Sequence, residues 1–131
     1  MLYLDSNIFI YATLNTKDIG EKARSLLQKI QQGEEAAQTS ALTFDEVFWA
    51  VKKHNLEAAF EASQALLNFP NLEIVSADRE LVLSALEIMK EHHLDPRDAI
   101  HAATAIAKKT NILVSTDNHF DRIKEIKRKP L

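Results

Sequence analysis

Four acidic residues stand where carboxylates could act together in chemistry. Asp5 and Asp117 follow short apolar segments, whereas Glu46 and Asp98 fall in the first turn of predicted helices. Carboxylates that are brought close together repel and raise each other's pKa, unless positive charge lies between them. Mg²⁺ supplies that charge and prefers oxygen ligands. The four acids therefore predict a metal site, provided that the fold brings them together.

A magnesium site of this kind suits the hydrolysis of a phosphodiester. The ion lowers the pKa of a bound water and offsets the charge that builds on the phosphate. Short polar residues flank the two strand-end acids and could orient them by hydrogen bonding: Ser6, Asn7, Ser115 and Thr116. Ordinary turn chemistry explains these four residues equally well.

Each acid also has an ordinary structural explanation. Thr43 and Asp95 are predicted helix N-caps, so Glu46 would complete a capping box and Asp98 would suit the helix dipole. The two strand-end acids could be turn residues. Capping is the simpler explanation for any one acid, but four acids at corresponding positions favour a shared site. Asp95 is expected to be only a structural cap.

Apolar patterning predicts the elements that must position the acids. Strands are predicted at 2–4 and 112–114, with weaker candidates at 37–39 and 72–75. Helical periodicity predicts helices at about 23–30, 44–51, 57–69, 79–91 and 96–109. Strands that alternate with helices predict an α/β fold with a mostly parallel sheet covered on both sides. In such a fold, strand C-termini and the N-termini of the following helices share one rim, where we expect the four acids.

Composition narrows the class of protein. A chain of 131 residues fits one domain, residues 1–131, and the absence of cysteine excludes disulfides and thiolate zinc sites. The first residues have no basic lead-in and carry Asp5 within their apolar run, so neither a signal peptide nor a membrane span is predicted. We expect a cytoplasmic protein without a membrane partner.

Basic residues gather locally although the formal net charge is -3. They form a pair at Lys52 and Lys53 and a run near the end of the chain, Lys127, Arg128 and Lys129. A solvated helix surface and a frayed tail explain these clusters in structural terms. A phosphate backbone would also be attracted to them.

The histidines and the missing motifs exclude several chemistries. His92 and His93 adjoin a helix end, and His101 lies one turn beyond Asp98, where a structural or supporting role is expected. Neither HExxH nor a cysteine-histidine zinc spacing occurs. The chain also has no glycine-rich phosphate loop and no GxSxG elbow, which argues against a P-loop nucleotide site and a serine hydrolase.

Together these residues resemble the PIN-domain ribonucleases, in particular the small VapC-like toxins of toxin-antitoxin pairs. The resemblance rests on LYLDSNIFIY with Asp5, TFDEV with Glu46, DPRDAIHAATA with Asp98 and ILVSTDNHF with Asp117. Those motifs occur in the family's order and span the chain. Residues 57–93 carry no motif of the family.

The resemblance implies a three-layer α/β/α sandwich and metal-dependent endonucleolytic cleavage of RNA. The four acids would be both catalytic and ligands of Mg²⁺ or Mn²⁺. A homodimer and a cognate antitoxin that covers or enters the active site are also implied. Asp121 matches an additional acid of some members, or is simply a surface residue. The basic residues at 52–53 and 127–129 are the candidates for RNA contacts, and Phe48 and Trp49 for antitoxin contacts.

Three other interpretations stay open. An RNA-processing nuclease without an antitoxin would use the same site, and a catalytically silent module that binds metal or RNA would keep its acids without cleaving. A phosphoacceptor receiver also gathers acids and Mg²⁺ at strand ends. It needs two adjacent acids after the first strand and a lysine after the last, whereas this chain has Asp5-Ser6 and Asp117.

Overall fold

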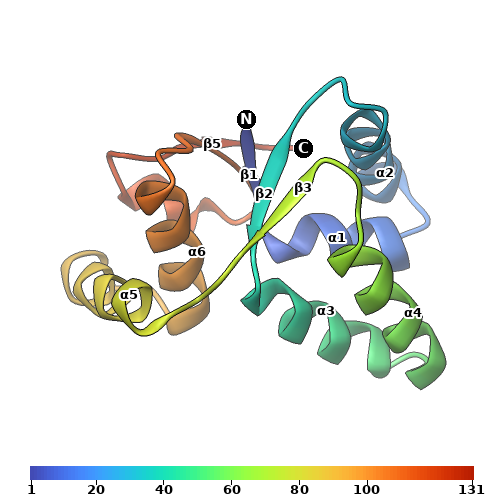
Figure 1. Ribbon diagram of the computed structural model, residues 1–131, viewed down its shortest axis with the longest axis horizontal. Coiled ribbons are helices and arrows are strands. Elements are labelled where there is room, and N and C mark those ends of the chain that lie inside the picture. Colours follow the sequence, from blue (N-terminus) through green and yellow to red (C-terminus); the bar gives the residue numbers. More distant parts are fainter.

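A five-stranded, wholly parallel sheet divides the molecule, which a computed structural model describes over residues 1–131 (Figure 1). The strands are β1 (Leu2–Leu4), β2 (Ala37–Ser40), β3 (Leu72–Val75), β4 (Ile112–Val114) and β5 (Lys127–Lys129). The helices are α1 (Ser6–Leu14), α2 (Asp18–Gln31), α3 (Leu42–Lys52), α4 (Leu56–Leu67), α5 (Arg79–His92) and α6 (Pro96–Ala107), with a 3-10 turn, η1 (Asn118–Arg122). The strand order β3-β2-β1-β4-β5 confirms the predicted α/β/α sandwich with a parallel sheet.

The two faces of the sheet carry separate cores. Leu2 and Leu4 of β1 pack with α1 to α4, whereas Tyr3 between them packs with α5, α6 and the segment around η1. This alternation follows from the two-residue period of a strand. Figure 1 shows α1 to α4 on one side of the central strands and α5 with α6 on the other. Because β1 lies in the middle of the sheet, both cores contribute to the position of Asp5, the next residue.

Helix α6 is built to lie close to the sheet. Pro96 occupies its first turn, where no amide hydrogen is needed, and Asp95 precedes it without a side-chain capping bond. The expected cap is therefore in place but does not act through its carboxylate. Four alanines on the helix are buried: Ala99, Ala102, Ala103 and Ala105. Their small side chains let the helix backbone approach its neighbours, which places Asp98 at the rim.

Helix α3 starts earlier than its sequence pattern suggested. The Ser40 hydroxyl accepts a hydrogen bond from the Leu42 amide at 3.1 Å, and the helix begins there. Thr43 is buried within the first turn and shares a 2.7 Å hydrogen bond with Thr39. The prediction of Thr43 as the cap is therefore wrong, because its hydroxyl is taken by the neighbouring strand. Glu46 consequently lies in the second turn of α3.

Two elements have no apolar periodicity and were not predicted. Helix α1 reads SNIFIYATL, which is apolar on nearly every side, so no amphipathic repeat marks it. Strand β5 reads KRK and pairs in parallel with β4, with Lys127 opposite Ile112. The interpretation of residues 127–129 as a frayed tail is wrong, because an edge strand needs only backbone hydrogen bonds.

None of the helices combines the length and the apolar character that crossing a membrane requires.

Candidate active site

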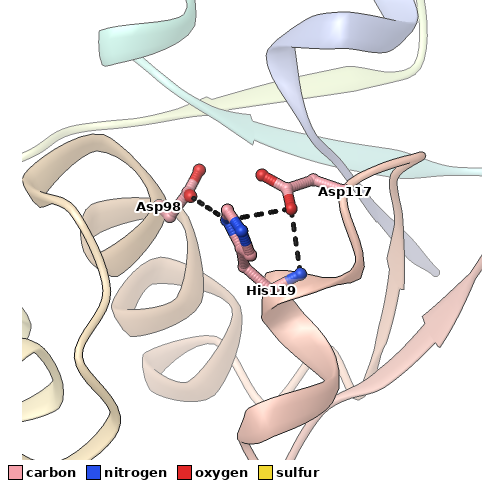
Figure 2. A group of neighbouring side chains, drawn as sticks. All are labelled: Asp98, Asp117 and His119. Atoms are coloured by element: carbon pink, nitrogen blue, oxygen red, sulfur yellow. Dashed lines mark hydrogen bonds and ion pairs between the residues drawn. The ribbon is translucent and has the colours of Figure 1, made fainter.

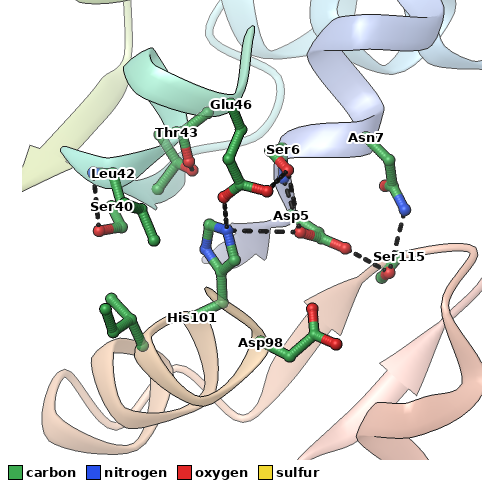
Figure 3. Close-up of polar contacts among 12 residues, drawn as sticks. Asp5, Ser6, Asn7, Ser40, Leu42, Thr43, Glu46, Asp98, His101 and Ser115 are labelled. Carbon is green, nitrogen blue, oxygen red and sulfur yellow. Dashed lines mark hydrogen bonds and ion pairs between the residues drawn. The ribbon is translucent and has the colours of Figure 1, made fainter. Parts of the chain in front are cut away.

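The four acids converge on the rim where the strands end, each from a different element. Asp5 directly follows β1 and caps α1, and Asp117 follows β4 and caps η1. Glu46 projects from α3 and Asp98 from the first turn of α6. Figure 3 shows Asp5, Glu46 and Asp98 around His101. The parallel topology therefore brings together acids that are far apart in the sequence.

Asp5 is the most deeply buried of the four acids, and both of its oxygens are hydrogen-bonded. Oδ1 accepts from the Ser6 amide at 2.7 Å, and Oδ2 accepts from the Ser115 hydroxyl at 2.6 Å. Burial raises the pKa of Asp5 above its usual range, and nearby His101 and these donors offset only part of that rise. The carboxylate is thus fixed in orientation while its negative charge remains costly.

Glu46 is held by donors from two other elements. Its Oε1 lies 2.7 Å from Nε2 of His101, and its Oε2 accepts from the Ser6 hydroxyl at 2.7 Å (Figure 3). Burial by itself would raise the pKa of Glu46, but the hydrogen bond and charge of His101 outweigh it, so the pKa is lowered. Glu46 is therefore ionised at neutral pH.

His101 is completely buried and bonds through both ring nitrogens. Nδ1 lies 2.7 Å from the hydroxyl of Tyr3, and Nε2 faces Glu46 and also lies 3.5 Å from Oδ1 of Asp5. Burial would lower the pKa of His101, but the two acids more than compensate and raise it. The side chain of His101 therefore links the core residue Tyr3 to Glu46 and Asp5.

Asp98, Asp117 and His119 form the open side of the rim (Figure 2). Nδ1 of His119 lies 3.1 Å from Oδ1 of Asp117 and 3.6 Å from Oδ2 of Asp98. The His119 amide also donates to Oδ1 of Asp117 at 2.9 Å. Burial raises the pKa of Asp98 to about 6, with further contributions from Asp117 and Asp5. Negative charge at this point is therefore incompletely balanced by the protein.

Exposure increases steadily across the site. The side chains of Asp5 and Glu46 are 6% and 14% exposed, those of Asp98 and Asp117 are 20% and 29%, and that of His119 is 49%. A pocket of about 410 Å³ opens beside them and is lined by Glu46, Asp95, Pro96, Arg97 and Asp98. The pocket thus reaches Glu46 and Asp98, and the more exposed side of the site is formed by Asp98, Asp117 and His119.

The four polar residues predicted to support the acids divide into two pairs. Ser6 and Ser115 bond directly to acids, as described above. Asn7 instead donates to the hydroxyl of Thr116 at 3.0 Å and to that of Ser115 at 3.3 Å. Asn7 and Thr116 therefore contact the residues around the acids and form no hydrogen bond with the acids themselves.

Asp121 forms an ion pair at the protein surface. Nε and Nη2 of Arg128 donate to its two carboxylate oxygens at 2.9 and 3.1 Å, and Nη1 of Arg128 donates to the Ser115 carbonyl. This pair links β5 to the loop after β4, from which Asp117 projects. The Asp121 carboxylate is therefore bonded to Arg128, and the guanidinium of Arg128 is bonded to Asp121 and to the Ser115 carbonyl.

The other basic candidates lie at two separate places. Lys52 and Lys53 are exposed at the end of α3, where the ammonium of Lys52 lies 4.8 Å from the centre of the Trp49 ring. Lys127 and Lys129 are exposed on the edge strand β5.

No sequence motif marked His119 as a site residue, although it stands only two residues after Asp117. The tight turn of η1 places the His119 ring close to the carboxylates of Asp117 and Asp98.

The chemistry of the open side suits a divalent cation. Single ligand atoms from Asp98, Asp117 and His119 lie within 4.8 Å of one another, which is close enough to share one ion. Carboxylates suit Mg²⁺ and Mn²⁺, and an imidazole nitrogen favours a transition metal over Mg²⁺. A cation there would also offset the cost of burial and the repulsion from Asp117 and Asp5, which together raise the pKa of Asp98. The residues present therefore fit a metal.

Comparison with known proteins agrees with this architecture. Ribonuclease VapC2 of Methanocaldococcus jannaschii is 26% identical over an alignment that covers 93% of this chain and 88% of that protein. VapBC2 from Rickettsia felis, solved with a DNA fragment of its promoter, has a TM-score of 0.76 at 21% identity and covers 99% of this chain and 98% of the other.

Two further solved structures share the fold. VapC20 from Mycobacterium tuberculosis, described as a toxin that cleaves the sarcin-ricin loop, gives a TM-score of 0.77 at 15% identity over 92% of this chain and 93% of the other. A toxin-antitoxin complex from Klebsiella pneumoniae gives 0.72 at 21% identity over 97% and 96%. The PIN domain family model matches residues 2–126. The chain therefore belongs to the PIN domain family.

Proposed function

We propose that this protein is a metal-dependent endoribonuclease and the toxin of a toxin-antitoxin pair. The observation that carries the proposal is the convergence of Asp5, Glu46, Asp98 and Asp117 on one rim, with Asp98 and Asp117 open to solvent. The similarity to Ribonuclease VapC2 supports RNA as the substrate. The acidic site supports hydrolysis of its phosphodiester bonds.

Mg²⁺ or Mn²⁺ would be held by the four acids. Asp98 and Asp117 would supply ligands from the open side with His119 beside them, and Asp5 and Glu46 would face the ion from the buried side. Such an ion supplies an activated water and offsets the negative charge that develops on the phosphate. Ser6 and Ser115 keep the buried carboxylates in place, so they need not reorganise when the ion binds.

RNA would approach over the open side. Lys52 and Lys53 are exposed at the C-terminal end of the helix that carries Glu46, whereas the guanidinium of Arg128 is already bonded to Asp121. Lys127 and Lys129 are exposed on β5 and remain candidates for backbone contacts. Local positive charge is sufficient for phosphate binding even in an acidic protein.

An antitoxin would bind the exposed aromatic surface of α3 and α4. Trp49 is 52% exposed and Phe60 is 62% exposed, and Phe48 joins Phe60 to Phe44 in a row of ring contacts. Large aromatic side chains commonly anchor protein interfaces. The structural relatives from R. felis and K. pneumoniae are toxin-antitoxin complexes, which supports this partner.

The first prediction concerns cleavage. The purified chain should cut a mixed RNA pool with Mg²⁺ or Mn²⁺ and stop when EDTA is added. Asp98→Asn and Asp117→Asn should each lower the rate by about 100-fold or more, because each removes a charged ligand. Asp18→Asn is the matched control, since Asp18 is an exposed acid in the first turn of α2 and does not line the pocket beside the site. Equal cleavage by Asp98→Asn and wild type would refute the proposal, and the absence of both cleavage and metal binding would favour a silent module.

The second prediction concerns pH and stability without metal. Because folding raises the pKa of Asp98 to about 6, the folded state binds its proton more tightly than the unfolded state. The resulting stability is present below about pH 4 and is lost as the pH rises through about 6. In EDTA at pH 7.5, Asp98→Asn should therefore be more stable than wild type by about 1–2 kcal/mol, a value reduced for solvent screening. At pH 4 the advantage should vanish.

Urea denaturation across this pH range, with Asp18→Asn as the control, measures the effect. An Asp98→Asn stability curve parallel to that of wild type from pH 4 to pH 7.5 would mean that folding does not raise the pKa of Asp98.

The third prediction concerns RNA binding, measured in the Asp117→Asn background to prevent cleavage. Lys52→Gln with Lys53→Gln should weaken binding and reduce the slope of log K against log salt by about 1 for each phosphate that is no longer neutralised. Lys29→Gln, an exposed change on α2, is the control. Unchanged affinity and salt slope in the double variant would remove these lysines from the RNA site.

The fourth prediction concerns the antitoxin, for which the probe is the protein encoded beside this gene. Trp49→Ala should weaken the complex by about 30-fold, as expected for an interface anchor worth about 2 kcal/mol. Leu83→Ala, which is as exposed on α5, should leave it unchanged. Light scattering of the mixtures measures complex formation. Light scattering of this chain alone shows whether it forms a homodimer. Equal binding by Trp49→Ala and wild type would exclude Trp49 from the interface.

A further inference from the structure

His101 connects the interior of the sheet to one of the rim acids. Tyr3 lies in the central strand β1, is completely buried, and places its hydroxyl 2.7 Å from Nδ1 of His101. On the opposite side of the ring, Nε2 lies 2.7 Å from Oε1 of Glu46 (Figure 3). The imidazole thus bridges a fixed point of the fold and a carboxylate of the site.

The surroundings of His101 do not require a polar side chain for packing. The other buried residues of α6 are mostly alanines, and burying an imidazole is costly unless both nitrogens find partners. Here both nitrogens have partners at short distance. One partner, Tyr3, belongs to the core, and the other, Glu46, belongs to the rim. His101 is therefore hydrogen-bonded both to the core, through Tyr3, and to the proposed site, through Glu46.

The orientation of Glu46 depends on these contacts. An ionised carboxylate only accepts hydrogen bonds, so Nε2 of His101 carries the proton that faces Glu46. The second oxygen accepts from the Ser6 hydroxyl, so donors from α6 and α1 hold the two oxygens separately. Each oxygen retains a further lone pair. Without His101, Glu46 would be held only by Ser6 and would face Asp5 with less positive charge between them.

We propose that His101, anchored by Tyr3, is a positioning residue that holds the Glu46 carboxylate in its metal-binding orientation. This inference rests on the metal-dependent function proposed above and extends it to two residues that touch neither metal nor RNA. Residues that hydrogen-bond to a ligand typically change metal affinity by about 10- to 100-fold when they are removed.

The experiment uses two amide replacements that differ in reach. The side-chain nitrogen of glutamine extends about as far as Nε2 of histidine, whereas that of asparagine reaches only about as far as Nδ1. His101→Gln therefore retains the bond to Glu46 and loses the one to Tyr3, and His101→Asn does the reverse. The probe is Mn²⁺, whose binding affinity is measured by titration calorimetry without any need for RNA cleavage.

We expect His101→Asn to weaken Mn²⁺ binding by about 10-fold or more and His101→Gln by only about threefold. Tyr3→Phe, which removes just the hydroxyl, should resemble His101→Gln. In a Glu46→Gln background none of these changes should weaken binding further, because residues that act through one partner are not additive. A purely structural role would lower stability without this order of affinities.

Several results would overturn the proposal. Wild-type Mn²⁺ affinity in His101→Asn would do so, and so would equal losses in the asparagine and glutamine variants. If His101→Asn fails to fold, unchanged affinity in both His101→Gln and Tyr3→Phe would overturn it equally. A wild-type protein that binds no Mn²⁺ would instead overturn the metal-dependent function itself, and this inference with it.

Discussion

Repulsion among carboxylates at the strand-end rim is the constraint around which this structure is arranged. A parallel sheet directs the ends of β1 and β4 to the same edge, so Asp5 and Asp117 meet there, and α3 and α6 add Glu46 and Asp98. Burial makes each negative charge more costly. The protein compensates with hydroxyls, amides and one buried imidazole, and it does so unevenly across the site.

The compensation divides the site into a braced half and an open half. Asp5 and Glu46 are bonded on both oxygens to donors from α1, α6 and the loop after β4. Asp98 has the half-exposed ring of His119 close by, and burial together with the charges of Asp117 and Asp5 still raises its pKa. The braced half is preorganised, and the open half is where a cation or a substrate gains most by binding.

The C-terminal part of the chain supports the site in an indirect way. Strand β5 extends the sheet beside β4, and Arg128 joins Asp121 to the carbonyl of Ser115. The hydroxyl of Ser115 in turn donates to Asp5 and accepts from the Asp117 amide at 2.9 Å. A basic segment that looks suited to RNA thus also organises the loop that carries Asp117. This arrangement leaves Lys127 and Lys129, on either side of Arg128, facing solvent.

The fold class and the rim position of the acids follow from local patterns in the amino-acid sequence. Short apolar segments that alternate with amphipathic helices predict a parallel sheet, and parallel strands end at one edge whatever the side chains are. The same local signals failed for α1, which is apolar on nearly all sides, and for β5, which carries three basic residues and is held by backbone bonds.

How the acids are held depends instead on contacts between distant elements. The contacts of His101 with Tyr3 and Glu46 span 98 and 55 residues of sequence, and no local pattern encodes pairings over such separations. His119 becomes part of the site because the turn of η1 folds its ring over Asp117, and Arg128 is paired because Asp121 lies beside it. Residue types and spacing establish which groups are available, whereas packing between distant elements establishes which of them are braced, paired or open.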